Sequence, residues 1–332
     1  MSPYFPFQAL PTELKSAVFG FVHCKRDRGV ARLVCRLWDE LMCPHMWREL
    51  KVKVDENISN RMSTLLKQKK SILPHVQDVS IFYQDGCESH NVTFAPLFAG
   101  LCQDKLTDFF TMAPIKSSDF LLLLSNQVQI KEMSVLVDFS DLSPDSSSKN
   151  WFTAHASTIT KALSRVEGLE INLSTSKTSE YEVQCQHAKA FIENSPRLKS
   201  VSLLADITST RGVLALEDTF GTMHNGVAPL GNVTTLDLRD LDLWFLKNFP
   251  LQGFDLSSLQ QLGITYFWHP TILLQHLAKH FQRSGSRLQH LQVALGFDSD
   301  EEGALEALEA VYSRSRACKH CGSIADLTED LS

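Results

Sequence analysis

The first fifty residues carry apolar side chains at helical spacing. They recur at steps of three to four residues, at Leu10, Leu14, Val18 and Phe21 or Val22, and this period predicts one stripe of an α-helix. Pro11 suits the first turn of that helix, where a missing N–H costs nothing. A second apolar group follows Gly29 and continues until Pro44, which is expected to interrupt it. We therefore predict three short helices with an aromatic tail.

So short a helical unit cannot bury all of its apolar side chains, because a chain below about 40 residues rarely forms a sufficient core. The side chains that compete for this small interior include Leu10, Leu14, Val18, Leu33, Val34, Trp38 and Trp47. We expect part of this surface to be buried against another protein. The alternative is that all of it packs on the rest of the chain. Cys35 lies inside the apolar pattern and is predicted to be a small core residue.

Three segments of this region carry a family resemblance. Residues 10–14 (LPTEL), 33–38 (LVCRLW) and 47–50 (WREL) resemble the F-box pattern in order and spacing. The resemblance implies docking onto the Skp-type adaptor of a cullin-RING ubiquitin ligase. The residues to which it assigns adaptor binding are Leu10, Pro11, Leu14, Val18, Leu33, Val34 and Trp38. The chain departs from the family where Phe19 and Phe21 replace the usual Leu or Ile, and where Lys25, Arg26 and Arg28 replace an acidic link.

The remainder of the chain repeats a different pattern, apolar-x-x-apolar-x-apolar. It occurs at Val76-Val79-Ile81, Ile130-Met133-Val135, Val166-Leu169-Ile171, Leu198-Val201-Leu203, Val233-Leu236-Leu238, Leu259-Leu262-Ile264 and Leu288-Leu291-Val293, with a weaker copy at Leu106-Phe109-Thr111. Each copy predicts a strand. Helical segments are predicted between the strands at residues 120–124, 151–163, 188–192, 272–281 and 304–312.

A strand followed by a helix, many times over, resembles an irregular leucine-rich repeat. We therefore predict an α/β fold, in which a short three-helix F-box precedes a leucine-rich-repeat-like solenoid of about eight irregular repeats. The likeness is to fungal F-box substrate receptors. The expected divisions are an F-box-like domain at residues 1–50, the solenoid at 51–313 and a flexible tail at 314–332. A doubly wound α/β sheet is the competing fold, but no glycine-rich phosphate loop follows any of these strands.

The residues between the apolar strand positions are expected to line the exposed face of the sheet. The candidate contacts for a target protein are Asp237, Arg239, Thr265, His290 and Gln292. The plainer alternative for each of them is an ordinary solvated strand residue. We expect no strongly basic or aromatic set among the exposed positions, and so predict neither a phosphate-recognising pocket nor an aromatic cage.

Composition narrows the class of partner. The chain has 332 residues with 32 Lys and Arg against 38 Asp and Glu, a net charge of −6. No overall basic field exists to hold nucleic acid, and no apolar run approaches the length that spans a bilayer. With no secretory signal expected, the eight cysteines are predicted to be reduced thiols. The expected location is the cytoplasm or nucleus.

Two segments imitate metal sites. Positions of a calcium-binding loop are matched by Asp298, Asp300, Glu302, Gly303, Leu305 and Glu309. A capping box formed by Ser299 and Glu302 is the simpler explanation, because the preceding residues read as a strand and not as an entering helix. Cys318 and Cys321 have the spacing of half a zinc site, which His280 and His290 would have to complete. We therefore predict no metal and no cofactor.

Enzyme signatures are missing from the sequence: no GxSxG, Walker, GxGxxG or HExxH motif occurs. His45 is expected to be structural. The sequence therefore predicts a non-catalytic substrate receptor, which binds a Skp-type adaptor and through it the cullin and RING subunits, and whose repeats bind an unknown protein target. The alternative is a repeat scaffold that takes no part in ubiquitination.

Overall fold

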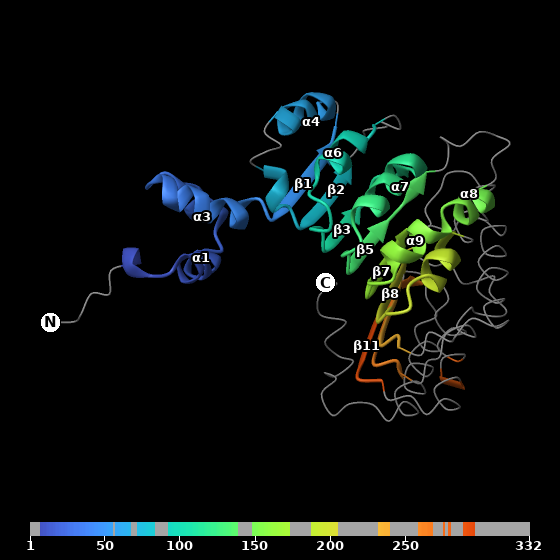
Figure 1. Cartoon of the computed structure of the whole chain (residues 1–332). Helices are drawn as coiled ribbons and strands as arrows, with labels where there is room; N and C mark the ends of the chain where they lie inside the picture. Colours follow the sequence, from blue (N-terminus) through green and yellow to red (C-terminus); the bar gives the residue numbers. More distant parts are fainter. Residues whose placement is uncertain are drawn as a thin grey trace.

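A computed structural model describes most of the chain. The described residues are 7–55, 57–67, 72–83, 92–138, 148–172, 187–204, 232–239, 258–267, 275, 278–279 and 288–295. They form a unit of three short helices, followed by a mixed α/β region with a parallel sheet. In Figure 1 the three helices lie beyond one end of that sheet, next to its first strand.

The helical unit begins with a short 3-10 turn, η1 (Phe7–Ala9), and its three helices are α1 (Thr12–Gly20), α2 (Lys25–Arg32) and α3 (Arg36–Met46). The prediction of three helices is confirmed. Pro44 does not end the third helix as expected, since α3 continues through it to Met46. Proline removes one hydrogen bond and crowds the preceding turn, but only His45 and Met46 of the helix follow it. The N–H of Trp47 still donates to the carbonyl of Cys43, at 3.1 Å.

The sheet has nine strands, and its strand order follows the chain. The strands are β1 (Glu49–Val54), β2 (Asp78–Tyr83), β3 (Asp108–Thr111), β5 (Glu132–Val135), β7 (Gly168–Asn172), β8 (Ser200–Leu204), β9 (Thr235–Arg239), β10 (Gln261–Phe267) and β11 (His290–Leu295). Every neighbouring pair is parallel. Each of the eight predicted motifs has its second and third positions on a strand of this sheet, with the first just before it. The short strands β4 (Ile115–Lys116) and β6 (Val137–Asp138) pair separately.

The register explains why the motif recurs. The middle apolar positions of the motif are aligned from strand to strand, in the order Leu50, Val79, Phe109, Met133, Leu169, Val201, Leu236, Leu262 and Leu291. All but Leu291 are buried, and Leu291 packs against the same core. In parallel strands a shift by one residue would turn every side chain to the other face. The same apolar spacing in each copy therefore keeps the buried positions of neighbouring strands aligned in one core.

Helices cover one face of the sheet (Figure 1). They are α4 (Ile58–Lys67), α6 (Ala95–Gly100), α7 (Ser117–Asn126), α8 (Ser148–Ala154) and α9 (Ala156–Leu163), with a 3-10 turn η2 (Leu73–His75) and a further helical stretch at residues 187–193. The predictions at 120–124, 151–163 and 188–192 are confirmed. The segments 272–281 and 304–312 lie almost or entirely outside the described residues. Within the described chain no helix combines the length and the apolar character needed to cross a membrane.

A buried glutamine hydrogen-bonds the backbone of the turn that precedes β3. Gln127 is fully buried, and its Oε1 accepts from the N–H groups of Lys105 and Leu106 at 3.1 and 3.0 Å. Its Nε2 donates to the carbonyl of Cys102 at 2.8 Å. Because a buried polar group without a partner costs about 1–3 kcal/mol, these three bonds keep Gln127 compatible with the apolar interior. They also fix the turn that leads into β3.

The first strand was not predicted as such. β1 alternates exposed and buried residues along its whole length, with Leu50, Val52 and Val54 facing the core. The boundary predicted at residue 50 therefore falls inside a strand. Trp47, Leu50 and Val52 repeat the apolar-x-x-apolar-x-apolar spacing of the later copies. Trp47 also packs against the large core, so this residue belongs to the sheet region as well as to the end of the helical unit.

Candidate functional site

The interior of the helical unit is small. Its buried apolar residues are Phe19, Leu41 and Met42, with Phe7, Val22, Ala31 and Trp38 packed against them. The rings of Phe7, Phe19 and Trp38 contact one another edge to face, with centroids 5.0 to 5.5 Å apart. Such geometry suits aromatic quadrupoles. The departure from the F-box pattern at Phe19 is compatible with a closed core, because Phe19 is one of the central residues of that core.

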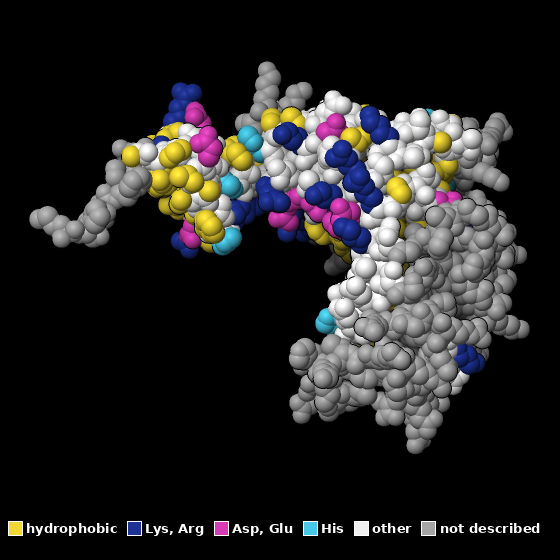
Figure 2. All heavy atoms as spheres, turned by 60° about the horizontal axis from the view of Figure 1, so that its bottom comes forward, with side chains coloured by type: hydrophobic (Ala, Val, Ile, Leu, Met, Phe, Trp, Pro, Cys, Tyr) yellow, Lys and Arg dark blue, Asp and Glu magenta, His cyan; other side chains and the backbone are white. Residues whose placement is uncertain are grey.

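The exterior of the same unit is strongly apolar. Eight large hydrophobic side chains are exposed in the described part of the chain, and seven of them belong to this unit: Leu14, Val18, Phe21, Val30, Leu33, Val34 and Leu37. Leu33 is 85% exposed and Phe21 is 77% exposed. Figure 2 shows hydrophobic side chains (yellow) gathered on the helical unit. Single exposed apolar residues are normal, but a gathered patch of this kind marks an interaction site.

Most of the residues predicted to bind an adaptor lie on this apolar face. Leu14, Val18, Leu33, Val34 and Pro11 are exposed. Leu10 and Trp38 are only half-buried, and the Trp38 ring is engaged in the core of the unit. Their role as contacts stays a prediction. Phe21, Val30 and Leu37 were not in the predicted set.

Two other predictions for this unit differ from the structure in part. Cys35 is exposed and not a core residue, because it precedes α3 as its N-cap and lies outside the helix packing. The idea that all the apolar surface packs on the following region is wrong, since the seven side chains above remain exposed. Val30 and Leu37 could have been found from the sequence, because they belong to the same apolar group as Leu33 and Val34.

Hydrogen bonds hold the helices in place. The Arg28 guanidinium donates to the carbonyl of Val22 and, at 2.6 Å, to the carbonyl of His45. His45 Nε2 lies 3.2 Å from Ser16 Oγ on α1. Burial lowers the pKa of His45, and the nearby Arg28 and Arg48 lower it further, against a hydrogen bond with Ser16 that raises it. His45 is thus neutral at pH 7 and joins α1 to α3, in agreement with the structural role expected for it.

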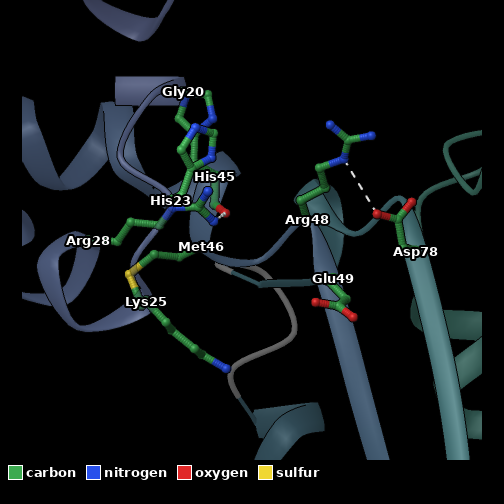
Figure 3. A pocket seen from close by; sticks show the side chains of 9 residues that line it. All are labelled: Gly20, His23, Lys25, Arg28, His45, Met46, Arg48, Glu49 and Asp78. Carbon is green, nitrogen blue, oxygen red and sulfur yellow. Dashed lines mark hydrogen bonds and ion pairs between the residues drawn. The ribbon is translucent and has the colours of Figure 1, made fainter. Parts of the chain in front are cut away.

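A pocket of about 530 Å³ lies where the helical unit meets the sheet. It is lined by Gly20, His23, Lys25, Arg28, His45, Met46, Arg48, Glu49 and Asp78. In Figure 3 the His45 ring lies beside Gly20, and Arg48, just before β1, pairs with Asp78 on β2, with 3.4 Å between Nε and Oδ2. Arg28 is engaged by carbonyl groups and Arg48 by a carboxylate. The pocket is therefore a polar seam between α2, α3 and the first two strands.

The predicted target contacts lie at the far end of the sheet. His290 and Gln292 are exposed on β11, and Asp237 is half-buried on β9. Asp237 is opposite Gly263 in the register, and a Cβ at that glycine would lie 2.4 Å from Asp237 Oδ1. The backbones of Arg239 and Thr265 belong to β9 and β10, but their side chains lie outside what the structure describes. The role of all five residues stays a prediction.

The two candidate metal segments lie outside the part of the chain that the structure describes. Asp298 to Glu309, His280, Cys318 and Cys321 lie outside the described residues. Within the described residues no group of three or more His, Cys, Asp or Glu side chains has the arrangement of a metal site.

The helical unit has a recognisable family. Residues 7–53 match the family model described as F-box-like. These residues form an F-box-like domain. The match covers η1, the three helices and nearly all of β1, so the F-box-like domain extends into the first strand of the sheet. No curated protein matches the chain.

Proposed function

We propose that the chain is the substrate-recognition subunit of a Skp-cullin-F-box ubiquitin ligase. The F-box-like domain binds the Skp-type adaptor, and the sheet region, an irregular leucine-rich-repeat-like solenoid, binds the target protein in the cytoplasm or nucleus. The observation that carries the proposal is the apolar face of Leu14, Val18, Phe21, Val30, Leu33, Val34 and Leu37. The F-box-like match at residues 7–53 supports the choice of an adaptor as its occupant.

The exposed face has the chemistry that a stable complex needs. Apolar surface removed from water contributes about 25 cal/mol per Å². The side chains concerned lie on the three helices and the turns that follow α1 and α2, around a core already closed by Phe19, Leu41 and Met42. Binding therefore orders few additional groups. The basic side chains of Lys25 and Arg26 are exposed on α2, the helix that also carries Val30, so the partner surface is expected to be acidic at its rim.

The proposed role in ubiquitin transfer is proximity. A target held on the sheet and a conjugating enzyme held through adaptor, cullin and RING subunits would meet at a high effective concentration. The chain then needs no catalytic residue of its own. This is a non-catalytic receptor function.

Adaptor binding is tested with the full chain and a purified Skp-type adaptor, by calorimetry or co-purification. The variant Leu33→Asp with Val34→Asp changes two side chains that contact nothing in the core, so it should fold normally and lose binding by about 100-fold or more. The matched control is Met112→Asp, an exposed apolar residue outside the F-box-like domain. Unchanged binding by the Leu33 and Val34 variant would refute the proposal.

A further inference from the structure

The open face of the sheet carries an apolar cluster near the F-box-like domain. Phe82 on β2 and Phe110 on β3 have ring centroids 5.5 Å apart, and both are half-buried. Met112 follows β3 and is 55% exposed, the one large exposed hydrophobic residue of the described chain outside the helical unit. We call these three residues the sheet patch. It contradicts the expectation that the exposed strand positions contain no aromatic set.

A row of carboxylates lies beside the sheet patch, at the beginning of the strands. The register aligns Asp78, Asp108 and Glu132 on three neighbouring strands, each on the same face as Phe110. Asp78 pairs with Arg48. Within the described residues Asp108 and Glu132 have no cationic partner within ion-pair distance. Figure 2 displays acidic and basic side chains gathered along this part of the sheet.

The carboxylates also act on one another. Burial raises the pKa of Asp78, and so do its hydrogen bond to Asp108 and the charge of that residue. Burial likewise raises the pKa of Glu132, with the charges of Asp108 and Glu167 adding to the effect and the charge of Lys199 opposing it. Like charges directly opposite on neighbouring strands destabilise a sheet. A basic side chain bound at Asp108 and Glu132 would reduce that repulsion.

We propose that the sheet patch and the carboxylates of Asp108 and Glu132 bind an extended target segment with one large apolar side chain and one Lys or Arg. The inference rests on the proposed function, because it names the target chemistry of the receptor. The basic side chain lies at the carboxylates and the apolar side chain lies between Phe82, Phe110 and Met112. Lys53 is exposed opposite Phe82 in the register, so a positive charge lies beside the patch at the end away from the carboxylates and favours one direction of the segment.

The spacing of the two anchors follows from strand geometry. Asp108 and Phe110 are two residues apart on one face, about 7 Å. Asp108 is level with Asp78 in the register, and Phe82 lies four residues beyond Asp78, about 13 Å along the strands. An extended segment rises about 3.3 Å per residue. The apolar and basic residues of the target are therefore two to four positions apart.

The test uses fluorescein-labelled ten-residue peptides with a Gly-Ser background, carrying one Leu and one Arg at separations of one to six residues. Binding to the full chain is measured by fluorescence anisotropy. Peptides with a separation of two to four should bind best, and replacing Arg by Glu, or Leu by Ser, should weaken binding about tenfold or more. Absence of binding below about 1 mM at every separation, or a preference for the Glu peptides, would overturn the proposal.

Three variants assign the binding to the patch. Phe110→Ser should weaken the best peptide about tenfold, and Asp108→Asn with Glu132→Gln should abolish the discrimination between Arg and Glu. Gln261→Ala, exposed on β10 on the same face of the sheet, should change nothing. Thermal melts confirm folding of each variant. Peptide binding that survives the Phe110 and carboxylate variants contradicts the proposal, and so does a dimer in sedimentation that Phe110→Ser abolishes, because a second copy would then be the occupant.

The two proposals fail separately. Leu33→Asp with Val34→Asp should lose the adaptor and keep the peptide, whereas Phe110→Ser should do the reverse. Loss of adaptor binding in the Phe110 variant, with its fold intact, contradicts the separate location of the two sites. A chain that binds the peptides but no adaptor would keep the sheet patch as an interaction surface and refute the ligase function.

Discussion

The sheet region buries nearly all of its described large apolar side chains, whereas the F-box-like domain exposes most of its own. The sheet buries one continuous cluster from Leu50 to Leu288, and Met112 is its one large exposed hydrophobic residue among those described. The F-box-like helices bury three residues and expose seven. A small core supplies little stability, so the sheet region is expected to fold by its own packing, whereas the helical unit is completed by a partner.

The largest difference in stability is expected when a Phe ring is removed from the core of the sheet region and from the exposed face of the helical unit. Phe109 is 1% exposed and contacts the Phe98 ring, with centroids 5.9 Å apart. Phe109→Ala should lower the free energy of unfolding by about 3–5 kcal/mol. Phe21→Ala removes the same ring from an exposed position and should change it by less than about 0.5 kcal/mol. Urea titrations measure both, and equal effects would contradict the contrast between the two regions.

Acid should act on the sheet region. Burial lowers the pKa of His187 to about 3, against an ordinary value of about 6.5. Between these values the unfolded chain binds a proton that the folded chain does not, so stability is complete above about pH 6.5 and falls as the pH decreases toward about 3. At pH 5 the loss is about 2 kcal/mol.

The variant that isolates this effect is His187→Gln, which has similar volume and no titration in this range. Its stability should fall less between pH 7 and pH 5 than that of the wild type, in urea titrations at both values. A parallel fall in both proteins would show that His187 does not carry the proton. Hydrogen exchange should locate the acid opening around Phe152, whose ring lies 4.8 Å from that of His187, and not on α1–α3.

A smaller effect is expected where the helical unit is held together by polar contacts. Arg28→Ala removes the donors to the carbonyls of Val22 and His45 and should cost about 1–3 kcal/mol. Faster hydrogen exchange should be confined to α1–α3. The matched control is Arg36→Ala, because the Arg36 side chain is 92% exposed in its pair with Glu40 and such pairs contribute about 0.5 kcal/mol or less. Equal losses in the two variants would show that Arg28 acts only as a surface charge.

The strand positions could be predicted because one spacing repeats along the chain. Each apolar-x-x-apolar-x-apolar copy specifies a residue before the strand and two residues inside it, and parallel pairing aligns the copies. β1 was missed, although Trp47, Leu50 and Val52 have the same spacing. Trp47 matches both the F-box pattern and the first position of the strand motif. Sequence spacing alone does not say that one residue fills both roles.

The apolar face could be predicted in kind but not in full. Sequence spacing predicts Leu14, Val18, Leu33 and Val34 on helices. Leu14 and Val18 are on α1, whereas Leu33 and Val34 lie in the turn between α2 and α3. The size of the unit implies that some of these side chains stay exposed. The inward position of Trp38 depends on its contacts with Phe7 and Phe19, which connect residues up to 31 positions apart in the sequence. Spacing within one helix carries no information on such contacts.

The sheet patch could not be predicted from any single repeat. Phe82 and Phe110 come from different strands, and their contact depends on the pairing of Ile81 with Thr111. The carboxylate row has the same origin, because Asp108 and Glu132 become neighbours only when β3 and β5 pair. Surface chemistry on a parallel sheet is a property of the columns across the strands, whereas the sequence displays the strands one by one.

The connection between α3 and β1 has a consequence for distance. Only Trp47 and Arg48 separate the end of α3 at Met46 from the start of β1 at Glu49, and the Arg48 carbonyl accepts from the N–H groups of Gln77 and Asp78 at 2.8 and 3.0 Å. So short a connection leaves the sheet little freedom to swing on the helices. Strands are about 4.8 Å apart, so a molecule held at β3 would lie about 10 Å from β1 and one held at β11 about 38 Å. The strand at which a molecule binds therefore determines its distance from a partner bound to the F-box-like domain.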